Sequence, residues 1–338
     1  MERPRSPCPY QRRTRPVRNV QDRRCGPPRP LRRRASGPAT LTEREDGVPT
    51  ESKEKRKALV VCGPTAAGKS DLADALAETL SEAYGAHATT IAVDSMQVYR
   101  ELPVITNQAR ARPAELIGIV SVAEEWTVAR HRGRAEETIC SLPAHVPFVL
   151  DAGTGMYLNA LVLDVDIAPS VPPQLRAEAQ RLATYAENPR REARRLELEL
   201  AGAQERGSIW EGPLRYDAAF VYLRPERQEL DRNIRARSSK IVRNGTEEAR
   251  RLLESGIEPN SSVREAIGVK EMLLYADGSL PAAEAEEVVA ARTRKLARRQ
   301  IRWFDKLARN LPDNSHLLVA ERPDDPKIKH LMHDRMVP

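Results

Sequence analysis

The chain has few cysteines and no long apolar run, and each absence argues against a class of protein. Its four cysteines, Cys8, Cys25, Cys62 and Cys140, lack the C-x-x-C spacing of a zinc knuckle. This cysteine usage fits a reducing compartment, and we expect a cytoplasmic protein that acts as a monomer. No apolar stretch approaches the ~20 residues that a membrane-spanning helix needs, so we do not expect a membrane enzyme.

Most of the chain also lacks a basic excess. Residues 1–35 hold twelve arginines against Glu2 and Asp22, a balance of +10, while the whole chain carries +7, which leaves −3 for residues 36–338. Any contact of residues 36–338 with nucleic acid must therefore depend on local clusters of positive charge. The Arg/Pro-rich residues 1–55 contain little to bury and are predicted to be a disordered tail. A targeting peptide, a dispensable tail and a basic arm for nucleic acid remain open for them.

Residues 63–70 read GPTAAGKS, which satisfies the pattern G-x-x-x-x-G-K-[ST], and they follow the apolar run 58–62. A strand that leads through such a loop into a helix is the context of a phosphate-binding loop. Glycines let backbone N–H groups turn toward anionic oxygens, and the helix adds its positive dipole end. The predicted phosphate-binding residues are Gly63, Thr65, Ala66, Ala67, Gly68, Lys69 and Ser70.

From residue 58 onward, short apolar runs alternate with longer helical patterns, which predicts an α/β fold with a parallel sheet. We expect residues 56–165 to form the first part of the core and 166–210 to form a helical insertion. Residues 211–320 should complete the core and supply C-terminal helices, over about 228–255 and 282–309. A short strand at 316–320 is expected to precede a polar tail, 321–338.

Two predicted strands, 91–93 and 148–150, end in the acids Asp94 and Asp151. Both acids are expected at the carboxyl edge of the sheet, where ligands bind in open α/β folds. Asp94 has the chemistry to accept a proton from a nucleophile or to hold Mg²⁺, and capping of the next helix is the structural alternative. Asp151 resembles the Asp that holds Mg²⁺ in nucleotide hydrolases. Thr154, between two glycines, is suited to orienting a substrate, with a plain Gly-rich turn as the alternative.

The predicted C-terminal helix is strongly basic. Only Asp305 opposes eight cations between residues 290 and 309: Arg292, Arg294, Lys295, Arg298, Arg299, Arg302, Lys306 and Arg309. Helical spacing places several of them along one side, which suits a phosphate backbone. A solvated basic surface is the alternative reading.

Taken together, these segments resemble the tRNA dimethylallyltransferase family, also called tRNA isopentenyltransferase. The matching stretches span residues 58–310, and they are GPTAAGKS at 63–70, DSMQVYR at 94–100, GTGMYL at 153–158, SVREAIGVKE at 262–271 and RTRKLARRQIRWF at 292–304. The phosphate loop is shared with many families, whereas five motifs in this order are specific.

The resemblance implies a fold similar to nucleotide kinases, with a P-loop parallel sheet. It also implies transfer of a prenyl group from dimethylallyl diphosphate to the exocyclic amine of the adenine 3′ of the anticodon in tRNA. The phosphate loop would then grip the diphosphate of the donor, and no nucleoside triphosphate would be consumed. The base would have to leave its stack to enter the site.

The resemblance also assigns roles to residues. Asp94 matches the acid that accepts the proton, and Thr154 matches a residue beside the reacting centre. Lys69 and Ser70 match contacts to the diphosphate and Mg²⁺. Two arginines of a helix, Arg232 and Arg237, are candidates for closing on the diphosphate. The residues assigned to tRNA binding are Ser95, Gln97, Arg292, Arg298, Arg299 and Gln300.

The chain departs from the family pattern at several places, which indicates a divergent member. Residues 102–110 (LPVITNQAR) keep little of the usual sequence, the insertion is shortened between 175 and 195, and Asp151 stands where an apolar residue is common. A P-loop kinase or nucleotide hydrolase, and a non-catalytic RNA-binding relative, remain the alternatives.

Overall fold

A parallel sheet of six strands organises the part of the chain that the computed structural model describes, namely residues 55–167, 171–203, 208–313 and 315–338. The strand order is β3-β2-β4-β1-β5-β6, and every pair is parallel. The strands are β1 (Lys57–Cys62), β2 (Thr90–Val93), β3 (Ala114–Glu115), β4 (Phe148–Ala152), β5 (Asp217–Leu223) and β6 (His316–Ala320). The expected disordered tail, 1–55, lies almost entirely outside the described residues.

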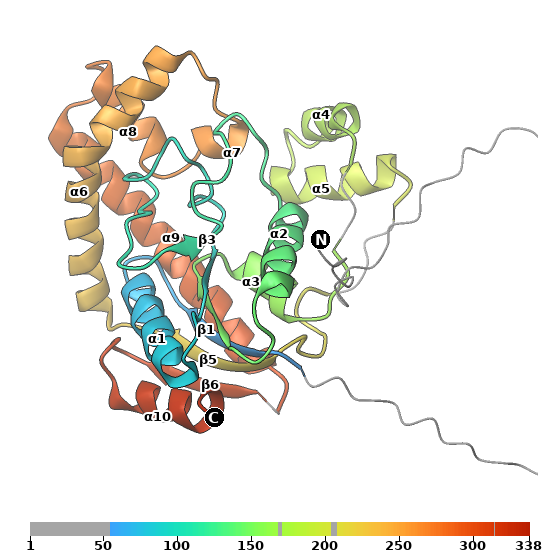
Figure 1. Cartoon of the computed structure of the whole chain (residues 1–338). Helices are drawn as coiled ribbons and strands as arrows, with labels where there is room; N and C mark the ends of the chain where they lie inside the picture. The colour runs from blue at the N-terminus through green and yellow to red at the C-terminus, as the bar shows by residue number, and fades with distance from the viewer. Residues whose placement is uncertain (1–54, 168–170, 204–207, 314) are drawn as a thin grey trace, which may run out of the picture. The chain divides into compact units, whose positions relative to one another are not determined.

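Helices cover both faces of the sheet (Figure 1). On one face, Leu59 and Val61 of β1 pack with α1 (Lys69–Tyr84) and α10 (Pro326–Met336). On the other face, Val60 and Cys62 share a core with α2 (Val128–Ser141), α3 (Gly155–Val162) and α9 (Ala282–Asn310). Burial on both faces explains why the central strands are continuous apolar runs.

Two long helices extend the structure beyond the sheet. Helix α6 (Arg227–Ser255) packs along α9 through Leu230, Ile234, Ala290 and Ala297. The short helices α7 (Ser261–Arg264) and α8 (Val269–Ala276) lie at the end of this pair farthest from the sheet (Figure 1). Within the described residues, none of the helices combines the length and apolar character needed to cross a membrane.

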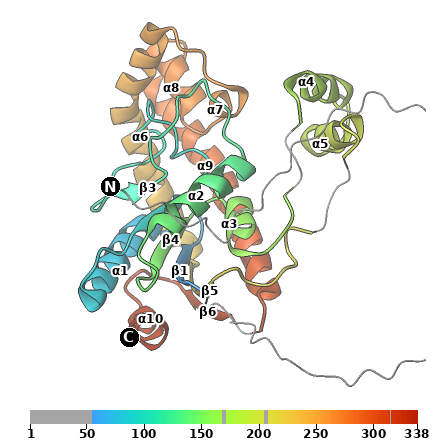
Figure 2. The same cartoon turned by 45° about the vertical axis from the view of Figure 1, so that its right-hand side comes forward.

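The predicted helical insertion is a pair of helices, α4 (Pro173–Leu182) and α5 (Pro189–Leu200). Buried Ala179, Ala193 and Leu198 lie on these helices, and the pair stands to one side of the sheet layer (Figure 2). Arg176 of α4 forms an ion pair with Glu125, which precedes α2. The insertion is therefore anchored to the core through its first helix.

The C-terminal segment differs from expectation, because residues 326–336 form helix α10 and not a polar tail. Ile328, Met332 and Met336 recur every four residues and are buried against the sheet. Asp325 caps the helix by accepting a hydrogen bond from the Lys327 amide at 3.0 Å. Charged residues between these three apolar positions hid the pattern in the sequence. The two-residue strand β3 was also not predicted.

Replacing Met332 with Ala is expected to lower the free energy of unfolding by about 2–4 kcal/mol, because it leaves a cavity between α10 and the sheet. Urea unfolding followed by circular dichroism measures the change. Lys329→Ala, at an exposed position of the same helix, serves as the control and should change it by less than about 0.5 kcal/mol. Equal effects of the two variants would contradict the packing of α10.

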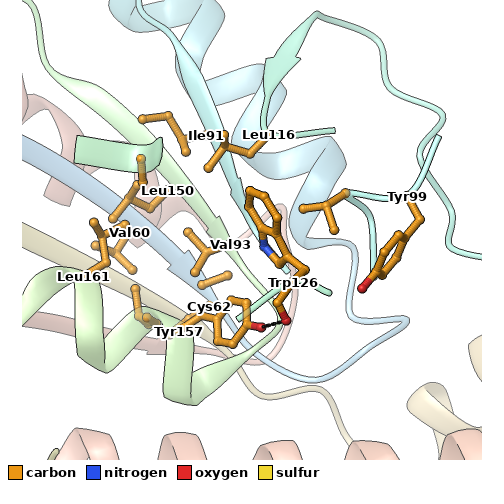
Figure 3. Packing of buried hydrophobic residues seen from close by; sticks show 14 of the residues in the cluster. Val60, Cys62, Ile91, Val93, Tyr99, Leu116, Trp126, Leu150, Tyr157 and Leu161 are labelled. Atoms are coloured by element: carbon orange, nitrogen blue, oxygen red, sulfur yellow. Dashed lines mark hydrogen bonds between the residues drawn. The ribbon is translucent and has the colours of Figure 1, made fainter. Parts of the chain in front are cut away.

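A buried histidine links α2 and α3 beneath the sheet. The Trp126 indole donates a hydrogen bond of 3.2 Å to Nδ1 of His131. The Tyr157 hydroxyl donates to the Trp126 carbonyl at 3.3 Å (Figure 3). Nε2 of His131 is buried and has no hydrogen-bond partner among the residues that the structure describes. Burial disfavours the charged imidazolium and lowers the pKa of His131 from 6.5 to about 4.

This lowered pKa makes folding stability depend on pH. The folded state binds fewer protons on His131 than the unfolded state between about pH 6.5 and 4, so stability is lost as the pH falls through this window. We expect the protonation of His131 in the unfolded state to lower the free energy of unfolding of the wild type by about 2 kcal/mol between pH 7 and pH 5. In the His131→Leu variant, this part of the decrease in the free energy of unfolding should be absent when urea unfolding is measured at both pH values. An unchanged pH dependence in the variant would show that His131 does not cause it.

Candidate functional site

The phosphate loop joins β1 to α1 in a backbone conformation that requires glycine at two positions. Gly63 has a φ of +149°, and a Cβ there would overlap the Leu223 carbonyl of β5. Gly68, with a φ of +82°, caps α1, and a Cβ there would lie 2.9 Å from Pro323. Because α1 begins at Lys69, its first amide N–H groups have no partner within the helix and are available to an anion.

Lys69 lies across this loop. Its Nζ donates a hydrogen bond of 2.7 Å to the Pro64 carbonyl. Burial lowers the pKa of Lys69, while the negative charges of Asp151 and Asp94 oppose that shift. The ammonium therefore lies near carboxylates from two neighbouring strand ends, as the sequence predicted for the carboxyl edge of the sheet.

Asp94 is held by the turn that follows β2. Its Oδ1 accepts hydrogen bonds from the amides of Met96 at 2.7 Å and Gln97 at 3.3 Å. Its Oδ2 faces Gly153, where an added Cβ would lie only 2.7 Å away. Thr154, next in the chain, accepts a hydrogen bond of 3.1 Å from the Ser95 amide. The structure thus brings the two predicted catalytic residues, Asp94 and Thr154, to adjacent loops.

Gln300 of α9 bridges the phosphate loop and the β4–α3 loop, a contact that the sequence did not predict. Its Oε1 accepts from the Thr65 amide and its Nε2 donates to the Gly153 carbonyl, both at 2.8 Å. Trp303, one turn later, packs so closely over Gly155 that no side chain fits there. Gln300 was assigned to tRNA, and the structure shows that it holds the phosphate loop against the β4–α3 loop. Thr65 was assigned to the diphosphate, and its amide donates to Gln300.

Helix α6 contributes one of the two arginines expected at the diphosphate. Burial lowers the pKa of Arg237, and the charge of Asp94 opposes this shift, so the guanidinium lies near the same site. Arg232 is exposed. Asn233 of α6 also contacts the phosphate loop, because its Nδ2 donates to the Ala66 carbonyl at 3.2 Å. Nothing in the residue pattern around Asn233 distinguishes it from its neighbours.

The basic residues of α9 divide into two groups. Arg292 forms an ion pair with buried Glu271, and Arg294 forms one with Asp231 at 2.6 Å. Arg292, assigned to tRNA, is therefore engaged within the protein. The remaining basic residues of the helix are exposed, and they are Lys295, Arg298, Arg299, Arg302, Lys306 and Arg309. Gln97, another residue assigned to tRNA, donates to the Asn107 carbonyl at 2.8 Å.

A buried arginine that the sequence did not indicate lies behind the phosphate loop. Arg110 pairs with Asp74 of α1 at 2.7 Å and with Asp151 of β4 at 2.6 Å. Oδ2 of Asp151 also accepts a hydrogen bond of 2.7 Å from the Ser70 hydroxyl. Asp151, one of the two acids considered for Mg²⁺, is thus already paired with a cation.

The family model described as IPP transferase matches residues 97–307. A tRNA dimethylallyltransferase of Rubrobacter xylanophilus is 58% identical over 284 residues, which cover 82% of this chain and 97% of the relative. The chain belongs to the IPP transferase family. It is an enzyme of a prenyltransferase family, as the resemblance implied.

Solved structures of IPP transferases agree with the fold. A full-length tRNA isopentenylpyrophosphate transferase of Bacillus halodurans aligns with a TM-score of 0.58 and 27% identity, covering 83% of this chain and 95% of that chain. A tRNA isopentenylpyrophosphate transferase of Staphylococcus epidermidis, at 22% identity and a TM-score of 0.60, covers 83% of this chain and 100% of that one and shows the fold alone. The predicted α/β fold with a P-loop kinase-like parallel sheet is confirmed.

A metal ion would find few protein ligands in this IPP transferase site. Among the residues that the structure describes, no group of three or more His, Cys, Asp or Glu side chains is arranged to hold one. The Ser70 hydroxyl, at the end of the phosphate loop, is an oxygen donor of the kind that P-loop proteins offer to Mg²⁺. One such donor fits an ion whose other ligands are diphosphate oxygens and water.

Replacing Gln300 with Ala is expected to weaken binding of inorganic pyrophosphate by up to roughly 30-fold, because two hydrogen bonds that hold the phosphate loop, each worth about 1 kcal/mol, are lost. Isothermal titration calorimetry measures this affinity. Asn310→Ala, an exposed amide at the end of the same helix, is the matched control and should bind as the wild type does. Unchanged binding by Gln300→Ala would mean that the loop keeps its shape without the bridge.

Proposed function

We propose that this chain transfers a dimethylallyl group from dimethylallyl diphosphate to the exocyclic amine N6 of the adenosine 3′ of the anticodon in tRNA. Membership of the IPP transferase family and the name of its 58% identical relative support this reaction. The observation that carries it is the placement of Asp94, a carboxylate near Lys69 and Arg237 and across from Gly153.

In this proposal the cations bind the donor. Lys69, Arg237 and the first amides of α1 supply positive charge where the diphosphate oxygens would lie, and they stabilise the charge that develops as diphosphate departs. The diphosphate of the donor would enter beside Ser70, at the start of α1. Gln300 supports this cradle from behind through the Thr65 amide.

Asp94 would act on the nucleophile. The nitrogen of the adenine amine forms a bond to the first carbon of the dimethylallyl group, and the bond from that carbon to diphosphate breaks. Diphosphate leaves with the electron pair, and the amine loses one proton, for which Oδ2 of Asp94 is the proposed acceptor. Thr154 fixes the Ser95 amide and thereby the turn that aims this carboxylate.

In this proposal Mg²⁺ would bind to the site together with the diphosphate. The Ser70 hydroxyl would contact it, and the ion would neutralise part of the charge on the leaving group when bound. Binding of the donor by Lys69 and Arg237, and proton transfer to Asp94, would be carried out by protein residues.

Exposed cations of α9 would contact the tRNA backbone. Arg298, Arg299 and Arg302 lie on the solvent side of the helix whose inner side holds Gln300 and Trp303. Such a stripe attracts phosphates without reading sequence. Selection of the adenosine would come from the site beside Asp94, where the extruded base is held.

Incubation with labelled dimethylallyl diphosphate and an anticodon stem-loop tests this function, with ATP turnover measured alongside. We expect label in the stem-loop, no label when the adenosine 3′ of the anticodon is replaced by guanosine, and no turnover of ATP. ATP hydrolysis without labelling would favour a P-loop kinase or hydrolase. Stem-loop binding without labelling would favour an RNA-binding relative.

Asp94→Asn separates the catalytic role of Asp94 from its structural role. The amide oxygen can still accept from the Met96 and Gln97 amides, but the side chain can no longer take up a proton. We expect transfer to fall at least about 100-fold, with binding of pyrophosphate retained. Asp277→Asn, at the exposed C-terminal end of α8, is the control. Full transfer activity of Asp94→Asn would remove this carboxylate from the reaction.

A further inference from the structure

Arg110 is the centre of a buried charge network that the proposed reaction does not use. Its Nε and Nη2 donate to Oδ1 of Asp74 at 3.1 and 2.7 Å, and its Nη1 donates to Oδ2 of Asp151 at 2.6 Å. Only 4% of the Arg110 side chain is exposed, against 3% for Asp74 and 4% for Asp151. Buried ion pairs of this kind require close contact and matched hydrogen bonds, which this network has.

The same arginine holds Ser70 at two points. Nη2 of Arg110 donates to the Ser70 carbonyl at 3.3 Å. The Ser70 hydroxyl donates to Oδ2 of Asp151 at 2.7 Å, the oxygen that also accepts from Arg110. Because three nitrogens of Arg110 are engaged with protein oxygens, the guanidinium is placed to position Ser70 and not to bind a diphosphate itself.

The network joins two places where this chain departs from the family pattern. Asp151 stands where an apolar residue is common, and Arg110 ends the altered segment 102–110. In the fold these two departures form one ion pair. The carboxylate of Asp151 beside the phosphate loop is thereby paired with a cation that lies 41 residues earlier in the chain.

The charge of Arg110 bears directly on metal binding. A carboxylate beside a P-loop serine is the usual partner of Mg²⁺ in nucleotide hydrolases. A guanidinium bonded to the same carboxylate oxygen repels a dication and competes for that oxygen. Asp151 is therefore not available to bind Mg²⁺, as the corresponding Asp does in nucleotide hydrolases.

We propose that Arg110 is a positioning residue that takes the place of a protein-bound divalent cation at Asp151, so that a metal ion enters this site only together with the diphosphate. Ser70 then offers its hydroxyl in a fixed position, and the ligands of the ion come from the diphosphate and water. This inference rests on the diphosphate site of the proposed function.

Titration with Mn²⁺, with free ion followed by electron paramagnetic resonance, tests the proposal with and without inorganic pyrophosphate. Without pyrophosphate, Arg110→Gln is expected to bind Mn²⁺ at least roughly tenfold more tightly than the wild type, because Asp151 loses its counter-charge. Adding Asp151→Asn to that variant should abolish the gain. Arg112→Gln, which changes a neighbouring arginine that contacts Ser81 and Glu78, should match the wild type.

Asp151→Asn alone gives a second test that does not depend on the folding of Arg110→Gln. With pyrophosphate present, this variant should bind Mn²⁺ within about twofold of the wild type, since Asp151 is not a metal ligand in the proposal. A tenfold loss in Asp151→Asn, or wild-type Mn²⁺ affinity in folded Arg110→Gln, would overturn it. Failure of the wild type to bind pyrophosphate at all would instead count against the proposed function.

Discussion

The balance between Lys69 and two carboxylates from adjacent strands is the interaction on which the site depends. Strand β4 lies between β1 and β2, and Asp151 of β4 is paired in register with Val61 of β1 and Ala92 of β2. Asp94 follows Ala92 by two residues, so the parallel register brings both acids to the edge where Lys69 lies. These carboxylates partly compensate the charge of buried Lys69.

Features that are local in sequence could be predicted. The phosphate loop, the strand-end position of Asp94 and the two long helices depend on motifs and periods within about 30 residues. Contacts that join distant segments could not. Gln300 and Thr65 are 235 residues apart, and nothing in the spacing of either residue indicates the other. Helix α10 was missed for a different reason, since only three apolar residues mark its buried side.

The same limit applies to the partners of individual site residues. Composition identified α9 as basic, but not which of its cations the protein itself would engage. Arg292 meets Glu271, which lies on α8 and is buried, and this partner is evident only once α8 is folded against α9. The strand before Asp151 resembles the one that precedes the Mg²⁺-binding Asp of nucleotide hydrolases. The pairing of Asp151 with Arg110 depends on the path of a segment without regular structure.

Gly68 and Pro323 connect the beginning of the catalytic core to the end of the chain. Pro323 lies against the glycine that starts α1, and the segment around it leads from β6 into α10. The last strand and helix thus support the phosphate loop from outside. For the gene, this means that a premature stop codon at or before codon 323 would remove the residue that lies against Gly68, so truncations that reach Pro323 belong with loss-of-function alleles and not with harmless trimming of an end.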